Sequence, residues 1–335
     1  MAGAPLVVRL NSITCPPLPE ERAMLAAVGA QMTEIEEISE RAGECDALMV
    51  VSARLPARLI EGLHRCKVIS RLGTGVDRID LEAATRAGIM VTNLPDFCTE
   101  EVADHTLALL LAAARQLSQF QEQMRQGKPP APAEGLRRLS TQVLGLVGLG
   151  RIGRAVARRA RAFGMQVLAV DPEVSAQTAE QEGVGLASLE GVLAAADYLC
   201  LLCPLTAETR HLLGRRELAL MKPTAVLINT ARGELVDEQA LVEALQQGTI
   251  RYAALDVYEG INVFSPGGFA TDHPLFGLPN VLMTPHVAAY SVESGWEQKV
   301  GGAQAVVEVL SGVWPRHLVN AEVVPWFEIA RPPGR

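Results

Sequence analysis

The stretch GLVGLGRIGRAVARRARAFGMQVLAVD, residues 145–171, constrains the fold more than any other part of the sequence. An apolar run at 143–147 leads into a G-x-G-x-x-G pattern, which opens a helical stretch at 152–163 with apolar residues on one side. A second apolar run ends in Asp171, about 20 residues after the glycines. The order strand, glycine turn, helix, strand predicts a doubly wound parallel sheet with a dinucleotide at the turn.

The three glycines of this pattern have separate physical tasks. Gly148 permits the tight turn, Gly150 lets a pyrophosphate approach the backbone, and Gly153 lets the helix pack against the strand. Arg151 and Ile152 begin the helix, where backbone N–H groups and the helix dipole favour an anion. We expect these five residues to hold the pyrophosphate, although a glycine turn that serves only packing has the same pattern.

The acid at the end of the second strand bears on which dinucleotide binds. The carboxylate of Asp171 can accept hydrogen bonds from the adenosine ribose, and its charge repels a 2′-phosphate. The sequence therefore predicts NAD rather than NADP. No Cys/His cluster has the spacing of a zinc site, so we expect no metal.

Apolar runs and helical patterns alternate along the rest of the chain, which is typical of parallel sheets covered by helices. The 335 residues suffice for two α/β domains with a binding cleft between them, and a Gly/Pro/Ala-rich stretch at 126–135 is the clearest boundary signal. Long helices are expected at 100–124, after an N-cap at Thr99, and at 297–311. The expected strands are 6–10, 47–51, 67–72 and 89–93 in the first half, and 143–147, 166–170, 198–202, 225–230, 252–257 and 281–284 in the second.

Charge and cysteine usage narrow the class of protein. The formal net charge of −8 argues against a nucleic-acid surface. No apolar run could span a bilayer, and the N-terminus MAGAPLVVRL lacks a basic region before a long apolar one, so we expect a cytoplasmic protein without membrane contact. The six cysteines are expected to be reduced, and Cys200 and Cys203 to pack in a strand rather than form a redox pair.

Polar residues lie at the ends of three later strands, namely Arg232, Asp256 and His286. Such ends share one edge of a doubly wound sheet, where ligands bind. An arginine clamps a carboxylate and a histidine donates a proton, so the set suits hydride transfer to a 2-keto acid. A surface arginine, a loop-capping acid and a plain turn histidine are the alternatives. The other histidines are expected to be structural or exposed: His64, His105, His211, His273 and His317.

Ordered sequence blocks extend this pattern over roughly residues 45–325. They include RLGTGVDRIDLEAATRAGIMVTNLP, EEVADHTLALLLAAAR, LGLVGLGRIGRAVA, INTARGELVDEQALVEAL, ALDVYE and DHPLFGLPNVLMTPHVAAYS. In these blocks the chain resembles the D-isomer-specific 2-hydroxyacid dehydrogenase family, in a branch similar to the C-terminal-binding-protein corepressors. The resemblance implies a flavodoxin-like substrate domain at 1–117 and 291–335, a Rossmann NAD-binding domain at 118–290, and a homodimer built with the long helix.

The resemblance also carries roles over to single residues of this chain. Arg232 and His286 match the catalytic arginine and histidine. The substrate carboxylate is expected beside Phe97, at the backbone N–H groups of Thr74, Gly75 and Val76. Beyond the glycine turn and Asp171, the cofactor is expected to meet Thr106, Cys203, Pro204, Thr209, Thr230, Ala231 and Asp256.

One position departs from the family pattern. Members usually carry a glutamate five residues after the strand-end acid, where it hydrogen-bonds the catalytic histidine and favours the protonated form. That position is Ile261 here, and isoleucine cannot accept the bond. Glu259 lies one pleat earlier, and it either replaces that glutamate as a catalytic residue or points into solvent.

Two functions follow from these expectations. The first is an NAD-dependent oxidoreductase that transfers hydride between NADH and a small 2-keto acid or D-2-hydroxy acid. The alternative, suggested by Ile261 and the corepressor-like blocks, is a non-catalytic NAD(H)-sensing binding protein. The first predicts turnover of a 2-keto acid, and the second predicts tight NADH binding without turnover.

Overall fold

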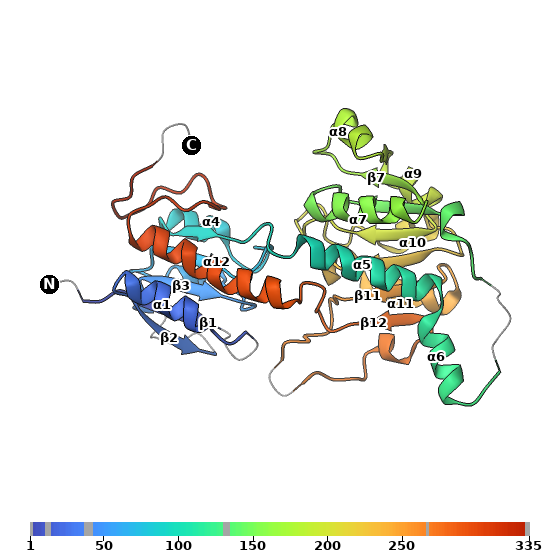
Figure 1. The fold of residues 1–335 in the computed structure, drawn as a ribbon, viewed down its shortest axis with the longest axis horizontal. Helices are drawn as coiled ribbons and strands as arrows, with labels where there is room; N and C mark the ends of the chain where they lie inside the picture. The colour runs from blue at the N-terminus through green and yellow to red at the C-terminus, as the bar shows by residue number, and fades with distance from the viewer. Residues whose placement is uncertain (1–2, 11–14, 37–42, 130–134, 266–267, 332–335) are drawn as a thin grey trace. The chain divides into compact units, whose positions relative to one another are not determined.

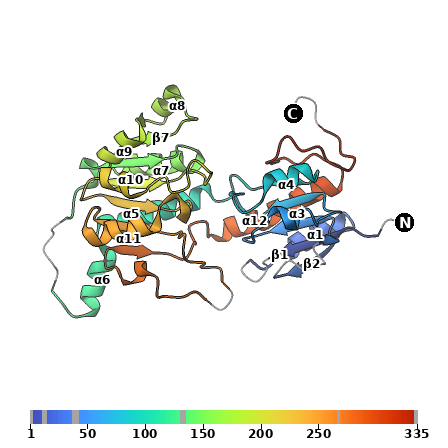
Figure 2. The ribbon, with the colours of Figure 1, turned by 180° about the vertical axis from the view of Figure 1, so that it is seen from behind.

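The computed structural model describes residues 3–10, 15–36, 43–129, 135–265 and 268–331. The chain forms two compact units (Figure 1, Figure 2). Unit 1 contains Met1–Phe97 and Ser291–Arg335, and unit 2 contains Cys98–Tyr290. Each unit is built around one parallel sheet with flanking helices, which confirms the α/β fold class that the alternating pattern predicts.

The sheet of unit 1 has the strand order β2-β1-β3-β4-β5, with every neighbouring pair parallel. Side chains alternate between its faces. Val7 packs with α1 (Pro19–Ala27) and α12 (Val292–Leu310), whereas Val8 packs with α3 (Ala57–Ile60) and α4 (Leu81–Arg86). Helices thus cover both faces, which explains the nearly continuous apolar strands. The strands are β1 (Leu6–Leu10), β2 (Gln31–Ile35), β3 (Ala47–Val50), β4 (Val68–Arg71) and β5 (Met90–Thr92).

The sheet of unit 2 has the order β12-β11-β10-β9-β6-β7-β8, again with parallel pairs. Helices α5 (Thr99–Ala114) and α7 (Arg151–Ala162) pack on one face, and α9 (Leu189–Ala195), α10 (Arg215–Leu220) and α11 (Glu238–Gln247) on the other. The strand order reverses between β6 and β9, which is the point where doubly wound sheets bind ligands. The strands are β6 (Val143–Val147), β7 (Gln166–Val170), β8 (Gly185–Leu186), β9 (Tyr198–Leu201), β10 (Val226–Asn229), β11 (Tyr252–Leu255) and β12 (Val281–Met283).

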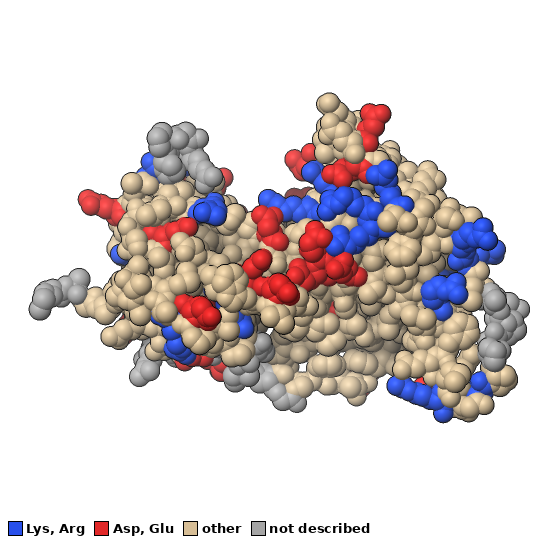
Figure 3. Space-filling view, viewed as in Figure 1, with Lys and Arg blue, Asp and Glu red and all other residues tan. Residues whose placement is uncertain are grey.

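Helix α5 belongs to unit 2, so the first division between the compact units lies at 97/98. The domain boundary at 117/118 that the resemblance implies stays a prediction. The reason is packing, since Leu107 and Leu110 join the apolar cluster of the unit 2 sheet. Ion pairs add to it, because Arg159 of α7 meets Glu100 at 2.5 Å and Asp104 at 2.6 Å. Figure 3 shows basic side chains gathered over α7 beside acidic ones over α5. Burial alone would lower the pKa of Arg159, but the two carboxylates outweigh burial and raise it.

The helix expected at 100–124 is two helices in the structure, α5 and α6 (Leu117–Arg125). The chain turns between them at Gln116, which has a left-handed φ of +52°. The expected N-cap Thr99 is the first residue of α5, and Cys98 is the N-cap. Edge strand β2 lies outside the expected strands because its sequence QMTEI mixes polar and apolar residues and stays partly exposed.

No helix in the described ranges is long and apolar enough to cross a membrane. Among the same residues, no group of three or more His, Cys, Asp and Glu side chains could hold a metal ion, and no cysteine forms a disulfide. Burial raises the pKa of the Cys200 thiol within β9, and it raises the pKa of Cys203 to about 11. Both thiols are therefore neutral near pH 7. Cys200 packs in a strand as expected, whereas Cys203 lies beyond the end of β9 and is half-buried.

Candidate functional site

The glycine turn between β6 and α7 has the geometry that a dinucleotide needs. Gly148 has a left-handed φ of +102°, and a Cβ there would come within 2.8 Å of the Cys203 backbone nitrogen. A Cβ on Gly153 would collide with the carbonyl oxygen of Gly148. A Cβ on Gly150, in contrast, would meet no atom within 4 Å. The first and third glycines therefore serve packing, and the second leaves open space at a helix N-terminus that has no side-chain cap.

Asp171 lies just past the end of β7, and its carboxylate is hydrogen-bonded to the backbone of this turn. Its Oδ2 accepts from the backbone N–H of Leu149 at 2.7 Å, and its Oδ1 accepts from Glu173 N–H at 2.9 Å. Each carboxylate oxygen keeps a second acceptor position, so the group can still receive ribose hydroxyls. The sequence spacing predicted the acid beside the turn, but not its hydrogen bond to the glycine loop.

The segment 203–209, expected to line the cofactor, is a closed turn after β9. Thr209 Oγ1 donates to the carbonyl of Pro204 at 2.7 Å and accepts from Thr206 N–H at 2.8 Å. Cys203 reaches the glycine turn through its backbone nitrogen, beside Gly148. The backbone of Cys203 therefore lies beside the glycine turn, and the expected contact of Cys203, Pro204 and Thr209 with the cofactor stays a prediction.

The turn after β10 carries Thr230, Ala231 and Arg232. Asn229 folds it, because its side chain accepts from Ala231 N–H at 3.1 Å and donates to the Arg232 carbonyl at 2.8 Å. Gly233 follows, and a Cβ there would collide with the backbone of Tyr258. The turn therefore packs directly against the segment that follows β11.

Thr230 and Thr106, both expected at the cofactor, are bonded to each other. Their hydroxyl oxygens lie 2.8 Å apart, and Thr106 donates its proton to the Val102 carbonyl at 2.7 Å. Both side chains are buried. Thr106 therefore ties α5 to the end of β10, a role that its position in the sequence did not reveal.

His286 lies in the loop after β12 and has a left-handed φ of +58°, an uncommon conformation for a residue other than glycine. Asp256, at the end of β11, is completely buried. Its Oδ1 accepts from Thr284 Oγ1 at 2.6 Å and from Val287 N–H at 2.9 Å, and its Oδ2 accepts from Ala288 N–H at 2.9 Å. The carboxylate therefore holds the loop on both sides of the histidine, and this positioning work explains why a buried acid is tolerated.

Ile261, at the usual glutamate position, is buried with 8% of its surface exposed. The Phe264 ring lies against the His286 imidazole, with ring centroids 5.0 Å apart. Both carboxylate oxygens of Glu259 lie 2.9 Å from Nε2 of His211. The catalytic role expected for Glu259 stays a prediction. In the structure its carboxylate contacts His211 and not His286.

A second acid holds the same segment from α11. Glu238 accepts from the backbone N–H groups of Glu259 and Gly260, both at 3.0 Å, and its Oε1 lies 2.9 Å from His273 Nε2. His211 and His273, expected to be structural or exposed, are therefore structural partners of this segment. Neither interaction joins neighbours in the sequence, so only the fold reveals them.

In unit 1, the loop predicted for the substrate carboxylate wraps around a guanidinium group. Arg71 Nε donates to the Gly75 carbonyl at 3.0 Å, and Nη1 donates to the Leu72 carbonyl. The Thr74 carbonyl accepts from the side chain of Asn93 at 2.7 Å. Gly73 has a φ of +153°, and a Cβ there would collide with the guanidinium. The carbonyls of Leu72 and Gly75 thus face a cation, whose positive charge favours an anion near this loop.

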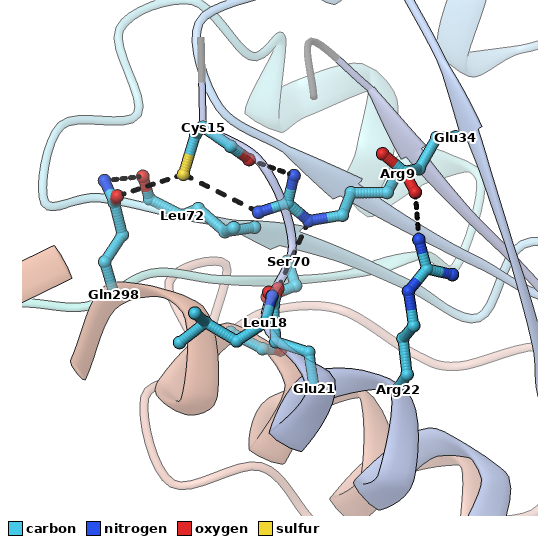
Figure 4. Close-up of polar contacts among 10 residues, drawn as sticks. Arg9, Cys15, Leu18, Glu21, Arg22, Glu34, Ser70, Leu72 and Gln298 are labelled. Carbon is cyan, nitrogen blue, oxygen red and sulfur yellow. Dashed lines mark hydrogen bonds and ion pairs between the residues drawn. The ribbon is translucent and has the colours of Figure 1, made fainter. Parts of the chain in front are cut away.

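The start of this loop is also supported from α12, as Figure 4 shows. Gln298 Nε2 donates to the Leu72 carbonyl at 3.0 Å, and its Oε1 accepts from Cys15 Sγ at 3.4 Å. Arg9 donates to the carbonyl of Cys15 and pairs with Glu21 at 3.2 Å, with both charged side chains fully buried. Phe97 is half-buried at the end of unit 1, and its expected place beside the substrate stays a prediction.

Comparisons with known proteins agree with the fold described above. Residues 107–288 match the family described as "D-isomer specific 2-hydroxyacid dehydrogenase, NAD binding domain". The D-3-phosphoglycerate dehydrogenase of Methanocaldococcus jannaschii is 42% identical over 88% of this chain and 56% of that protein. The glyoxylate reductase of Korarchaeum cryptofilum is 39% identical over 89% of this chain and 88% of that protein. The chain thus spans about half the length of that phosphoglycerate dehydrogenase and most of that glyoxylate reductase.

Solved structures of dehydrogenases and reductases share the fold of this chain. The D-lactate dehydrogenase from Aquifex aeolicus, complexed with NAD and lactic acid, matches with a TM-score of 0.82 and 29% identity over 91% of this chain and 96% of that one. The NADPH-dependent glyoxylate/hydroxypyruvate reductase from Sinorhizobium meliloti, with NADP and malonate, matches with a TM-score of 0.82 and 32% identity over 96% and 98%. The narrower resemblance to the corepressor branch is not confirmed by these relatives.

Proposed function

Because this chain belongs to the D-isomer specific 2-hydroxyacid dehydrogenase family, we propose that it transfers hydride between NADH and a small 2-keto acid or D-2-hydroxy acid. The observation that carries the proposal is the strand-end set of unit 2. The Arg232 turn, the buried Asp256 and the His286 loop follow β10, β11 and β12 in the same sheet as the glycine cradle. A non-catalytic NAD(H)-sensing protein is not favoured, since the relatives above are named as dehydrogenases and reductases.

NAD fits the residues of the cradle. Gly150 leaves open space at the N-terminus of α7 for a pyrophosphate, and Asp171 can accept ribose hydroxyls and repel a 2′-phosphate. When bound, this cofactor supplies or takes up the hydride. Arg151, Ile152, Ala231 and the 203–209 turn are proposed to complete its binding site.

Arg232 is proposed to bind the substrate carboxylate and polarise its keto group. A guanidinium suits this task because its planar set of donors pairs with two oxygens at once. Asn229 holds the Arg232 backbone, and Nη1 of Arg232 donates to the Ala231 carbonyl at 2.7 Å, which restrains the side chain. In unit 1, the loop of Thr74, Gly75 and Val76 is proposed to bind a substrate carboxylate through its backbone N–H groups.

His286 is proposed to donate a proton to the keto oxygen as hydride arrives, and to remove it in the reverse direction. The loop around it is held by Asp256 and does not depend on a glutamate at position 261. Glu259 remains a candidate to assist His286.

The test is a screen of the purified protein with glyoxylate, hydroxypyruvate and pyruvate, with NADH and NADPH side by side. We expect NADH oxidation with at least one keto acid, and a weaker response with NADPH because of Asp171. Arg232→Lys keeps the charge but loses the planar donors, so it should lose most activity. Arg86→Lys, at an exposed arginine of α4, is the matched control. No NADH oxidation with any keto acid would refute the proposal.

A homodimer and a cytoplasmic location complete the proposal. In α6 no side chain is buried, and Leu117 and Met124 are 56% and 77% exposed, so a second copy of the chain is the proposed partner. Leu117→Glu should then lower the mass measured by light scattering from two chains to one. The cysteines, none of which is in a disulfide in the described residues, suit the reducing cytoplasm.

A further inference from the structure

Two adjacent side chains of α5, His105 and Thr106, reach the ends of the strands that carry the proposed catalytic residues. His105 Nε2 lies 3.0 Å from Thr284 Oγ1 beyond β12, and Thr106 Oγ1 lies 2.8 Å from Thr230 Oγ1 beyond β10. We propose that this pair is a positioning device that sets the His286 loop, and that His105 acts there through Thr284 and Asp256. The inference deepens the proposed function and rests on it.

The chemistry of the groups fixes the direction of each hydrogen bond. A carboxylate only accepts, so the single hydroxyl proton of Thr284 goes to Asp256 Oδ1, 2.6 Å away. Thr284 Oγ1 must then accept from His105, which requires a proton on Nε2. The same nitrogen lies 3.6 Å from Asp256 Oδ1. His105 therefore compensates a buried carboxylate both through the threonine and by direct attraction.

This compensation matters because the loop that depends on it is strained. His286 keeps a left-handed φ, and such a residue persists only where its surroundings hold it firmly. Asp256 does so by binding Thr284 before the histidine, and Val287 and Ala288 after it. Without His105, the Thr284 hydroxyl loses its donor and the buried Asp256 carboxylate loses the nearby Nε2–H group, so the loop has more freedom.

Thr106 provides the second contact of the device. Its own proton goes to the Val102 carbonyl within α5, so Thr230 donates to Thr106. Both threonines are buried, and α5 is packed into the apolar cluster of the unit 2 sheet. One helix therefore restrains the turn of Arg232 and the loop of His286, and this couples their positions.

The first experiment compares His105→Leu with His105→Gln, whose amide nitrogen replaces Nε2 as a donor. In His105→Leu we expect kcat for keto-acid reduction to fall about tenfold, the factor that loss of one hydrogen bond of about 1.4 kcal/mol gives. The Kd for NADH, read from protein fluorescence, should stay within about twofold, because His105 does not act on the glycine cradle. His105→Gln should regain most of kcat. His64→Leu, at an exposed histidine of unit 1, is the control and should leave kcat unchanged.

The second experiment reads the loop without turnover. Hydrogen–deuterium exchange of the peptide with Val287 and Ala288 should quicken in His105→Leu and in Thr284→Val, which removes the hydroxyl. It should stay close to wild type in Thr284→Ser, in His105→Gln and in His64→Leu.

Unchanged kcat and unchanged exchange in His105→Leu would overturn the inference, as would equal losses in the Leu and Gln variants. If wild-type protein turns over no keto acid, the proposed function fails, and the exchange experiment still decides whether His105 holds the loop. If His105→Leu does not fold, faster exchange in Thr284→Val than in Thr284→Ser supports the inference, and equal exchange in the two overturns it.

Discussion

Two loops of the molecule are built around opposite charges. In unit 1, the loop at 72–76 surrounds the Arg71 guanidinium and turns carbonyl oxygens toward it. In unit 2, the loop at 284–288 surrounds the Asp256 carboxylate and turns N–H groups toward it. The central charge decides which backbone groups face inward. A loop folded around a cation leaves its N–H groups to bind an anion. A loop folded around an anion directs N–H groups toward that anion, and this arrangement suits a loop that holds a proton-donating residue.

The two loops also differ in how they accommodate a left-handed residue. Unit 1 uses Gly73, which adopts positive φ without strain. Unit 2 uses His286, where the side chain is needed and the strain has to be balanced by the bonds to Asp256. The first loop should therefore be sensitive to added atoms, and the second to lost hydrogen bonds.

The largest expected effect comes from removing the anion. Asp256→Ala leaves the Thr284 hydroxyl and the N–H groups of Val287 and Ala288 without their acceptor, so we expect a loss of about 3 kcal/mol in the free energy of unfolding. A displaced His286 should also lower kcat by about a hundredfold. Urea unfolding measures the loss of stability, and steady-state kinetics measure the fall in kcat.

The control is Asp80→Ala, which removes only the N-cap of α4. It should lower the free energy of unfolding by about 1 kcal/mol and leave kcat unchanged. Equal results for the two variants would contradict the role given to Asp256.

Removing the cation should act on substrate binding instead. In Arg71→Met the loop carbonyls lose their donor and the loop its positive charge, so the KM for the keto acid should rise about tenfold. NADH affinity should not change. Arg71→Lys should fall between, since an ammonium group cannot reproduce the fork of donors. A rise in the Kd for NADH equal to the rise in KM would show that the loop does not act on the substrate.

A smaller effect than that of Arg71→Met is expected when a single carbon is added at Gly73 in the unit 1 loop. Gly73→Ala brings a Cβ against the Arg71 guanidinium at an unfavourable φ, and we expect a loss of about 2 kcal/mol in unfolding free energy. Gly29→Ala is a matched control, because Gly29 also has positive φ (+75°) but has open space around it. It should cost about 1 kcal/mol. The difference between the variants measures the collision together with the less favourable φ of Gly73, and no difference would mean that the guanidinium moves aside and the backbone relaxes.

The smallest effect is expected at position 261. Ile261→Glu adds a carboxylate at the position where family members usually have glutamate. This carboxylate should favour protonated His286 and move the alkaline limb of the pH profile of kcat/KM for keto-acid reduction upward by about one pH unit. Ile261→Gln has the same shape without the charge and should not move that limb. If the glutamate variant has the wild-type profile, Glu259 already assists His286 and the loop is not purely anion-centred on Asp256.

The dinucleotide cradle could be predicted because its parts are adjacent in sequence. Gly148, Gly150, Gly153 and Asp171 lie within one strand–helix–strand segment, where spacing alone sets the geometry. The strand-end set of Arg232, Asp256 and His286 followed from the rule that parallel strands end at one edge. These predictions needed only the order of elements along the chain.

The supporting residues could not be predicted, because their partners are distant in sequence or hidden by the local pattern. Arg71 is the last residue of an apolar strand, and nothing local shows that a loop folds over its side chain. His105 is 179 residues from Thr284. The break between α5 and α6 at Gln116 has no glycine or proline to mark it, so the helical pattern ran through it. Tertiary contact, and not local preference, decides each of these features.

Substitutions in the glycine turn should have two different effects, loss of ligand binding and loss of folded protein. Because a Cβ at Gly150 meets no atom, an alanine there should leave the abundance of the protein in a cell unchanged while blocking the ligand. An alanine at Gly153 collides with the backbone and should lower abundance as well. A mutational survey scored on protein level would therefore pass position 150 as neutral, and only a survey scored on nucleotide capture would show it as a site of disabling variants.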